Sequence, residues 1–175
     1  QEGILYHHLS AADEDPYLLQ WRITFDSLPR LQAFAGALDQ VIARHDVLRT
    51  AVLWDGLAQP VQVVLRKARS VVVQVDSLDD AGRLPFDLAA APLIRLLHQA
   101  GEGAVEAMLQ FHHIVLDHTA MKVVLQEIRD HLQGTVPAQA PAPYRNYLAP
   151  ARLGTRQAAH DAFFRAALAE TREPT

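Results

Sequence analysis

The chain has 175 residues, of which 50% are hydrophobic and 21% are charged, a balance typical of one folded globular domain. Its formal net charge of -4 at pH 7 offers no positive field to a phosphate backbone, so we expect no nucleic-acid partner. Without cysteine, it has no disulfide, thiolate nucleophile or cysteine-ligated zinc, and no apolar run approaches the roughly 20 residues of a membrane span. We therefore expect a cytoplasmic protein with no membrane partner.

Three elements are predicted in the first 45 residues. Residues 1–9, QEGILYHHL, begin without Met inside an amphipathic helical pattern, which suggests a piece of a longer protein. Residues 17–26 alternate apolar and polar side chains and predict a strand with one buried face. Residues 28–45 carry apolar side chains at helical spacing after Ser27, a typical N-cap, and predict a helix on the core.

The middle of the chain predicts short strands. Two β-prone runs, 47–54 and 60–66, flank an Asp-Gly turn and indicate a hairpin, and residues 70–75 indicate a further strand. A linker with two prolines follows over residues 77–92.

The sequence of residues 93–101 and 104–113 is compatible with either two helices or two strands. Propensity permits helices, but their length, the glycines between them and the alternation of Leu109, Phe111 and His113 favour an antiparallel strand pair at least equally.

The last third of the chain predicts helices. Residues 119–134 place apolar side chains on one stripe, with Thr119 at the expected N-cap and Gly134 just past the end. After a proline-rich segment, two further helices are expected over residues 144–150 and 154–170. Strands interleaved with helices predict an α/β or α+β layer fold.

The segment QFHHIVLDHTAM (110–121) gathers four polar side chains, namely His112, His113, Asp117 and His118. A metal site is disfavoured, because neighbours on a strand point in opposite directions and no HExxH-like spacing is present. A polar cluster that caps a helix and satisfies hydrogen bonds is one remaining interpretation. Acid–base chemistry is the other, because histidine titrates near neutral pH and strand ends present working groups. Spacing alone leaves these two open.

Several segments resemble, in order, the motifs of condensation domains from nonribosomal peptide synthetases, relatives of chloramphenicol acetyltransferase. RHDVLRT (44–50) resembles the RHxxLRT motif, HHIVLD (112–117) resembles the start of HHxxxDG, and YRNYLA (144–149) resembles YxDY with Asn146 in place of Asp. The opening QEGILYHHL resembles the family's first helix, more in the subtype with a D-configured donor, and AFFRAALAETREPT (162–175) resembles the helix that leaves the N-terminal half.

The resemblance implies a chloramphenicol acetyltransferase-like lobe, a mixed β-sheet packed with helices as an α/β sandwich. Family domains have two such lobes around a cleft, so residues 1–175 resemble the N-terminal lobe, with the C-terminal lobe absent. The implied reaction is amide bond formation between a donor acyl or peptidyl thioester and an acceptor aminoacyl thioester. Both substrates are carried on phosphopantetheine arms of carrier proteins, next to an adenylation domain, and no bound cofactor or metal is implied.

The resemblance also assigns roles to residues. By this resemblance, His113 corresponds to the residue that acts on the acceptor's α-amino group, as a general base or by positioning it, and His112 would support it from the opposite face of the strand. Asp117 resembles the structural aspartate that pairs with an arginine, for which Arg49 and Arg44 are the candidates here.

Where the motif has Gly, this chain has His118, whose imidazole would narrow the tunnel, add a polar group or require a different turn. With half of the cleft missing, we expect the isolated lobe to fold without condensing substrates. Two alternatives stand beside this interpretation: a free-standing coenzyme A-dependent acyltransferase of the chloramphenicol acetyltransferase type, and a non-catalytic binding module.

Overall fold

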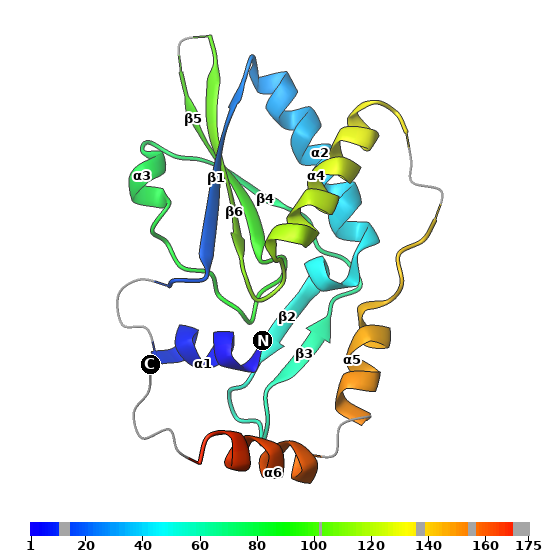
Figure 1. Cartoon of the computed structure of the whole chain (residues 1–175). Helices are drawn as coiled ribbons and strands as arrows, with labels where there is room; N and C mark the ends of the chain where they lie inside the picture. Colours follow the sequence, from blue (N-terminus) through cyan, green and yellow to red (C-terminus); the bar gives the residue numbers. More distant parts are fainter. Residues whose placement is uncertain (11–14, 102, 136–138, 154–156, 170–175) are drawn as a thin grey trace. The chain divides into compact units, whose positions relative to one another are not determined.

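The structure of the protein, a computed structural model, describes residues 1–10, 15–101, 103–135, 139–153 and 157–169 (Figure 1). The chain falls into two compact units, Gln1–Pro141 and Ala142–Thr175. The second unit contains the predicted helices α5 (Tyr144–Leu153) and α6 (Gln157–Ala167). No helix in the described part of the chain has both the length and the apolarity to cross a lipid bilayer.

A four-stranded mixed sheet forms the centre of the first unit. Its order is β1 (Leu18–Phe25), β6 (Val105–His112), β5 (Ile94–Ala100) and β4 (Val71–Gln74). Strand β6 is antiparallel to both β1 and β5, whereas β4 runs parallel to β5. The strand pair favoured for residues 93–101 and 104–113 is therefore confirmed.

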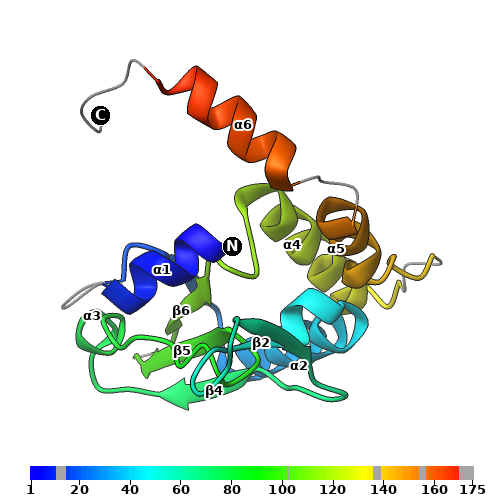
Figure 2. The same cartoon turned by 90° about the horizontal axis from the view of Figure 1, so that it is seen from below.

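Helices cover both faces of this sheet. Helices α2 (Leu28–Arg44) and α4 (His118–Leu132) contact each other and share a large core with Leu96 and Leu109 (Figures 1 and 2). The neighbouring strand residues, Leu97 and Met108, instead pack with the short helix α3 (Leu78–Ala81). This alternation follows from the two-residue period of a strand, which sends successive side chains to opposite faces.

A helix and a hairpin complete the first unit. Helix α1 (Glu2–Ser10) lies near the end of the sheet where β1 begins and β6 finishes (Figure 1). The predicted hairpin is confirmed as β2 (Thr50–Leu53) and β3 (Val61–Val64), but the residues before β2 form the 3-10 helix η1 (Asp46–Arg49).

A pair of facing residues in the sheet tests the assignment of the core. Leu96 is fully buried and lies opposite Val72, which is 40% exposed on the edge strand β4. We expect Leu96→Ala to lower the free energy of unfolding by about 2–5 kcal/mol, because it removes buried methyl groups and leaves a cavity. Val72→Ala, the control, should cost less than about 1 kcal/mol. Urea unfolding measures both, and equal losses would contradict this core.

Candidate active site

The two adjacent histidines lie where β6 ends and turns toward α4. His112 is the last residue of β6 and is fully buried, whereas His113 is half-buried in the turn. The backbone N–H of His112 donates to Leu93 O at 3.0 Å, and that of His113 donates to Tyr17 O at 2.8 Å. The residues that immediately precede β5 and β1 therefore hold the backbone of the histidine pair.

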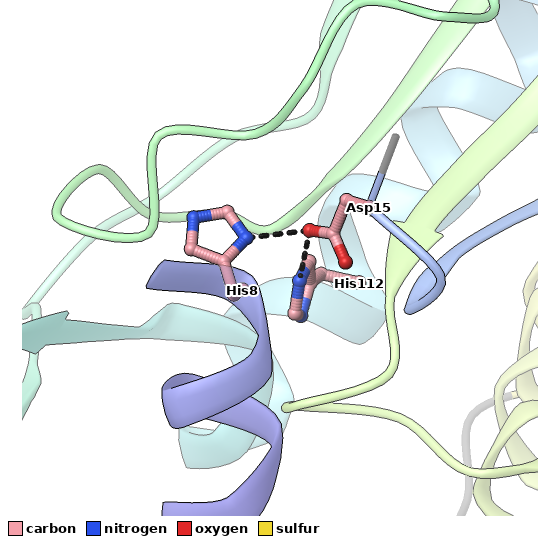
Figure 3. A group of neighbouring side chains, drawn as sticks. All are labelled: His8, Asp15 and His112. Carbon is pink, nitrogen blue, oxygen red and sulfur yellow. Dashed lines mark hydrogen bonds and ion pairs between the residues drawn. The ribbon is translucent and has the colours of Figure 1, made fainter. Parts of the chain in front are cut away.

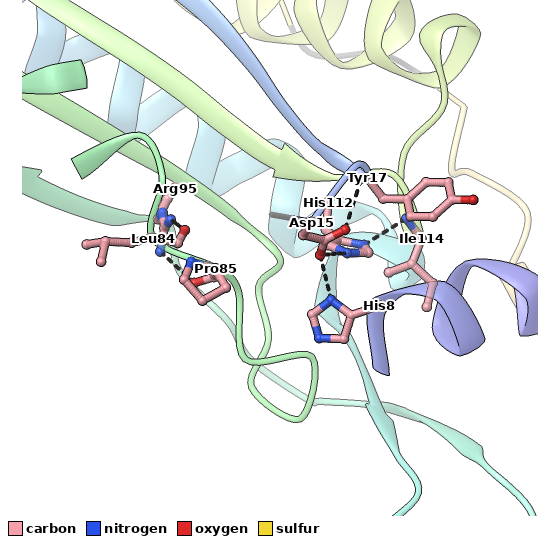
Figure 4. Close-up of polar contacts among 8 residues, drawn as sticks. All are labelled: His8, Asp15, Tyr17, Leu84, Pro85, Arg95, His112 and Ile114. Atoms are coloured by element: carbon pink, nitrogen blue, oxygen red, sulfur yellow. Dashed lines mark hydrogen bonds and ion pairs between the residues drawn. The ribbon is translucent and has the colours of Figure 1, made fainter. Parts of the chain in front are cut away.

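The ring of His112 uses both of its nitrogens. The N–H of Ile114 donates to Nδ1 at 3.1 Å, so Nδ1 carries no proton (Figure 4). Nε2 therefore carries the proton and donates it to Oδ2 of Asp15 at 2.8 Å. Burial lowers the pKa of His112 below 6.5, and the hydrogen bond and charge of Asp15 offset only part of this effect. The ring is therefore held neutral.

Asp15 accepts hydrogen bonds at both of its carboxylate oxygens. His8, from the last turn of α1, donates from Nδ1 to Oδ2 at 2.5 Å, and the N–H of Tyr17 donates to Oδ1 at 2.9 Å (Figure 3 for His8, Figure 4 for Tyr17). Burial raises the pKa of Asp15, but the hydrogen bonds from His8, Tyr17 N–H and His112 outweigh it and hold the pKa below 3.8. The side chain is therefore a buried carboxylate.

Sequence reasoning missed both His8 and Asp15. A local signal was present in the Asp-Pro-Tyr sequence before β1, because an aspartate commonly accepts a hydrogen bond from the backbone two residues later. No comparable signal indicated that Asp15 pairs with His112, because the two residues are 97 positions apart in the chain.

The ring of His113 is oriented by the turn that follows it. Nδ1 lies 2.8 Å from the carbonyl oxygen of Leu116, and since a carbonyl only accepts, Nδ1 carries the proton. In the neutral ring, Nε2 then holds a free electron pair. The ring also packs edge-on near Tyr17, with 6.4 Å between the ring centroids.

Asp117 has a different role from the one expected. Its side chain is exposed and accepts a hydrogen bond from the N–H of Ala120 at 2.6 Å, which makes it the N-cap of α4. The prediction of Thr119 as N-cap is therefore wrong. His118, the first residue of α4, is exposed, and no described residue other than glycine has a positive φ. The backbone at His118 thus does not require the glycine of the motif.

The expected ion pair of Asp117 with Arg49 or Arg44 is also wrong. Arg49 pairs with Asp46 at 2.7 Å and donates to Leu65 O, while Arg44 pairs with Glu127 at 3.3 Å. The reason is that Asp117 faces the first turn of α4, whereas these arginines have nearer acceptors of their own.

Glu127 connects the end of α2 to α4. It is buried and also bonds to Nε2 of His45 at 2.8 Å, beside its contact with Arg44. The first two residues of the RHDVLRT segment therefore brace α4 through Glu127.

The histidines and Asp117 of the 110–121 segment do not gather as a metal site. The structure instead brings together His8, Asp15 and His112, whose ligand atoms all lie within 4.8 Å of one another. A cation at Nε2 of His112 would require a proton on Nδ1, which would then face the N–H of Ile114. The hydrogen-bond pattern of this set thus fits a carboxylate between two imidazole N–H groups better than a cation.

Comparisons with known proteins agree with this arrangement of motifs. The family model named Condensation domain matches residues 1–175. The chain belongs to the condensation-domain family. Malpinin synthetase of Mortierella alpina is 36% identical over an alignment that covers 100% of this chain and 2% of that protein. Gramicidin S synthase 2 of Brevibacillus brevis is 30% identical over 85% of this chain and 4% of its own length. The chain thus spans only a few per cent of these curated relatives.

Solved condensation domains confirm the predicted fold. The condensation domain of the monacolin K polyketide synthase superposes with a TM-score of 0.72 at 16% identity and covers 99% of this chain. The first condensation domain of the calcium-dependent antibiotic synthetase gives a TM-score of 0.71 at 18% identity. This chain covers 42% and 47% of those two chains, respectively.

The neutral state of His112 predicts a pH dependence of stability. Its folded pKa is lowered, so below pH 6.5 the unfolded chain binds more protons and stability falls. The contribution of Asp15, whose pKa is also lowered, is lost only below pH 3.8. We expect the free energy of unfolding to decline from about pH 7 to about pH 5. Denaturant unfolding of His112→Asn, which keeps an acceptor for Ile114 N–H, should show a smaller slope than the wild type.

The role of Asp117 as a helix cap is tested by two substitutions. Asp117→Ala should lower the free energy of unfolding by about 1 kcal/mol, because it removes the acceptor for Ala120 N–H. Asp117→Asn keeps a capping oxygen but loses the charge, so it should be nearly neutral. Equal losses in chemical denaturation would instead indicate an ion pair.

Proposed function

We propose that this chain is the N-terminal lobe of a condensation domain and that it forms an amide bond together with a second lobe. The donor is an acyl or peptidyl thioester and the acceptor is an aminoacyl thioester, each carried by a phosphopantetheine arm of a carrier protein. The observation that carries the proposal is the ring of His113, whose Nδ1–H is donated to Leu116 O. Its Nε2 is therefore left as an acceptor at the end of a rigid strand.

The chemistry requires little from the lobe beyond position. The α-amino nitrogen of the acceptor attacks the donor's carbonyl carbon, an N–C bond forms, the C–S bond breaks and the thiol leaves with a proton. Nε2 of His113 accepts a hydrogen bond or a proton from the attacking amine. Because the thioester is already activated, no covalent nucleophile is needed, and most of the rate arises from holding two tethered reactants together.

The size of the chain supports a two-lobed active domain. It covers less than half of the solved condensation domains, whose remainder would supply the other wall of a cleft. Helix α6 and the residue after it carry Phe163, Phe164 and Leu168, each more than half exposed, which are suited to packing against further polypeptide. We infer that the isolated chain does not form amides.

Substitution of His113 in the complete condensation domain tests the proposal. His113→Ala should lower the rate of amide formation by about 10²–10⁴-fold, because the acceptor at Nε2 is removed. The measurement is single-turnover transfer between loaded carrier proteins, followed by mass spectrometry.

The matched control replaces His118, the first residue of α4, which stands where the family motif has Gly. His118→Gly restores the glycine of the family, and since His118 is exposed and the ring of His113 is hydrogen-bonded to Leu116 O, activity should persist. An unchanged rate for His113→Ala would leave the histidine pair without a catalytic role, as would be expected of a binding module.

A further inference from the structure

The carboxylate of Asp15 is hydrogen-bonded directly to His112 and is connected to His113 through the backbone of Tyr17. Oδ2 of Asp15 accepts the Nε2–H of His112, and Oδ1 accepts the N–H of Tyr17. The carbonyl of Tyr17 in turn accepts the N–H of His113. One hydrogen bond therefore joins Asp15 to His112. Two hydrogen bonds, with Tyr17 between them, join Asp15 to His113.

Helix α1 holds this carboxylate in place. His8 donates from Nδ1 to the same Oδ2, and the side chains of His8 and Asp15 are 15% and 6% exposed. The rings of His8 and His112 meet edge to face, with 5.3 Å between their centroids. We call Asp15 with His8, Tyr17 and His112 the Asp15 clamp (Figures 3 and 4).

The proposed reaction places demands on this arrangement. Proximity catalysis is sensitive to position, and a displacement of about 1 Å can cost about 10²-fold in rate. The ring of His113 is hydrogen-bonded to Leu116 O, within its own turn, rather than to β1 or α1. The position of His113 relative to those elements is therefore set by its backbone, by the nearby ring of Tyr17 and by its neighbour His112.

We propose that Asp15 and His8 are positioning residues of the condensation reaction, acting through the Asp15 clamp to fix His113 against β1 and α1. The inference depends on the proposed function, since it assigns a role in that reaction. Neither residue touches the reacting atoms. Their effect is expected on the rate of the chemical step rather than on substrate binding.

The clamp can be broken by a change of one atom. All three hydrogen bonds to the Asp15 carboxylate come from N–H groups, so both of its oxygens must accept. An asparagine has only one acceptor oxygen, and its NH₂ would face either the N–H of Tyr17 or the two imidazole N–H groups. Asp15→Asn therefore preserves shape but cannot preserve the bonding.

A matched pair at His8 separates the hydrogen bond from the packing. His8→Ala removes the donor, whereas His8→Asn places an amide N–H close to the position of Nδ1. Leu9→Ala, a change to an exposed residue of the same helix, controls for general loosening of α1.

The experiment has a spectroscopic part and a kinetic part. Nitrogen-15 NMR of the 175-residue chain reports which ring nitrogen of His112 carries the proton. We expect protonated Nε2 in the wild type and in His8→Asn, and an altered ring signal in Asp15→Asn. In the complete condensation domain, Asp15→Asn should lower kcat by about 10–100-fold with KM unchanged. His8→Ala should lower it less, and His8→Asn and Leu9→Ala should remain near the wild type.

Other results would overturn the inference or the proposed function on which it depends. Wild-type kcat in Asp15→Asn would remove the positioning role, and equal losses in His8→Ala and His8→Asn would show that packing, not the hydrogen bond, matters. If Asp15→Asn does not fold, the comparison of His8→Ala with His8→Asn tests the positioning role instead. Stoichiometric Zn²⁺ binding that displaces the proton of His112 Nε2 would replace the clamp by a metal site. A wild-type domain that forms no amide would refute the proposed function, while the NMR result would still judge the clamp itself.

Discussion

The buried imidazole of His112 imposes the constraint on which the site depends. A buried ring nitrogen without a partner costs stability, and here a backbone N–H occupies one side of the fully buried ring, so a buried acceptor is favoured on the other. Asp15 meets this need only because the chain before β1 turns its carboxylate inward and α1 supplies His8 as a further donor. The end of β6, the start of β1 and the last turn of α1 are thus fixed by one set of hydrogen bonds.

Much of the fold could be predicted from periodicity, because the alternation of buried and exposed side chains on a strand is visible in the sequence itself. The alternation from Leu19 to Phe25 located β1 within one residue at each end, and the helical spacing after Ser27 located α2. The start of α4 was misplaced because Asp117 and Thr119 are both capping residue types. Which of them caps depends on the path of the turn after β6, which no local pattern records.

The motif directed attention to the histidine pair, but the hydrogen bonds and ion pairs around it could not be predicted from the sequence. The predicted arginine pair failed because Arg49 finds Asp46 three residues earlier on η1, and Arg44 finds Glu127 across the helix pair. Ion pairs form between charged groups that are close in the folded chain, and a sequence motif does not specify these distances. Asp15 escaped notice for the same reason, since its partners His8 and His112 lie on either side of the sheet's first strand in sequence.

Different hydrogen bonds hold the two ends of the turn between β6 and α4. Before the turn, His112 is bonded to Asp15, and after it, Asp117 caps α4, which is itself tied to α2 through Glu127 and His45. His113 lies between these anchors with one nitrogen committed to Leu116 O, so its ring has little freedom to rotate. In the reaction proposed above, an oriented acceptor acts through its position, and this rigidity maintains that position. The polar groups around the turn are therefore best explained as supports that fix the position of His113.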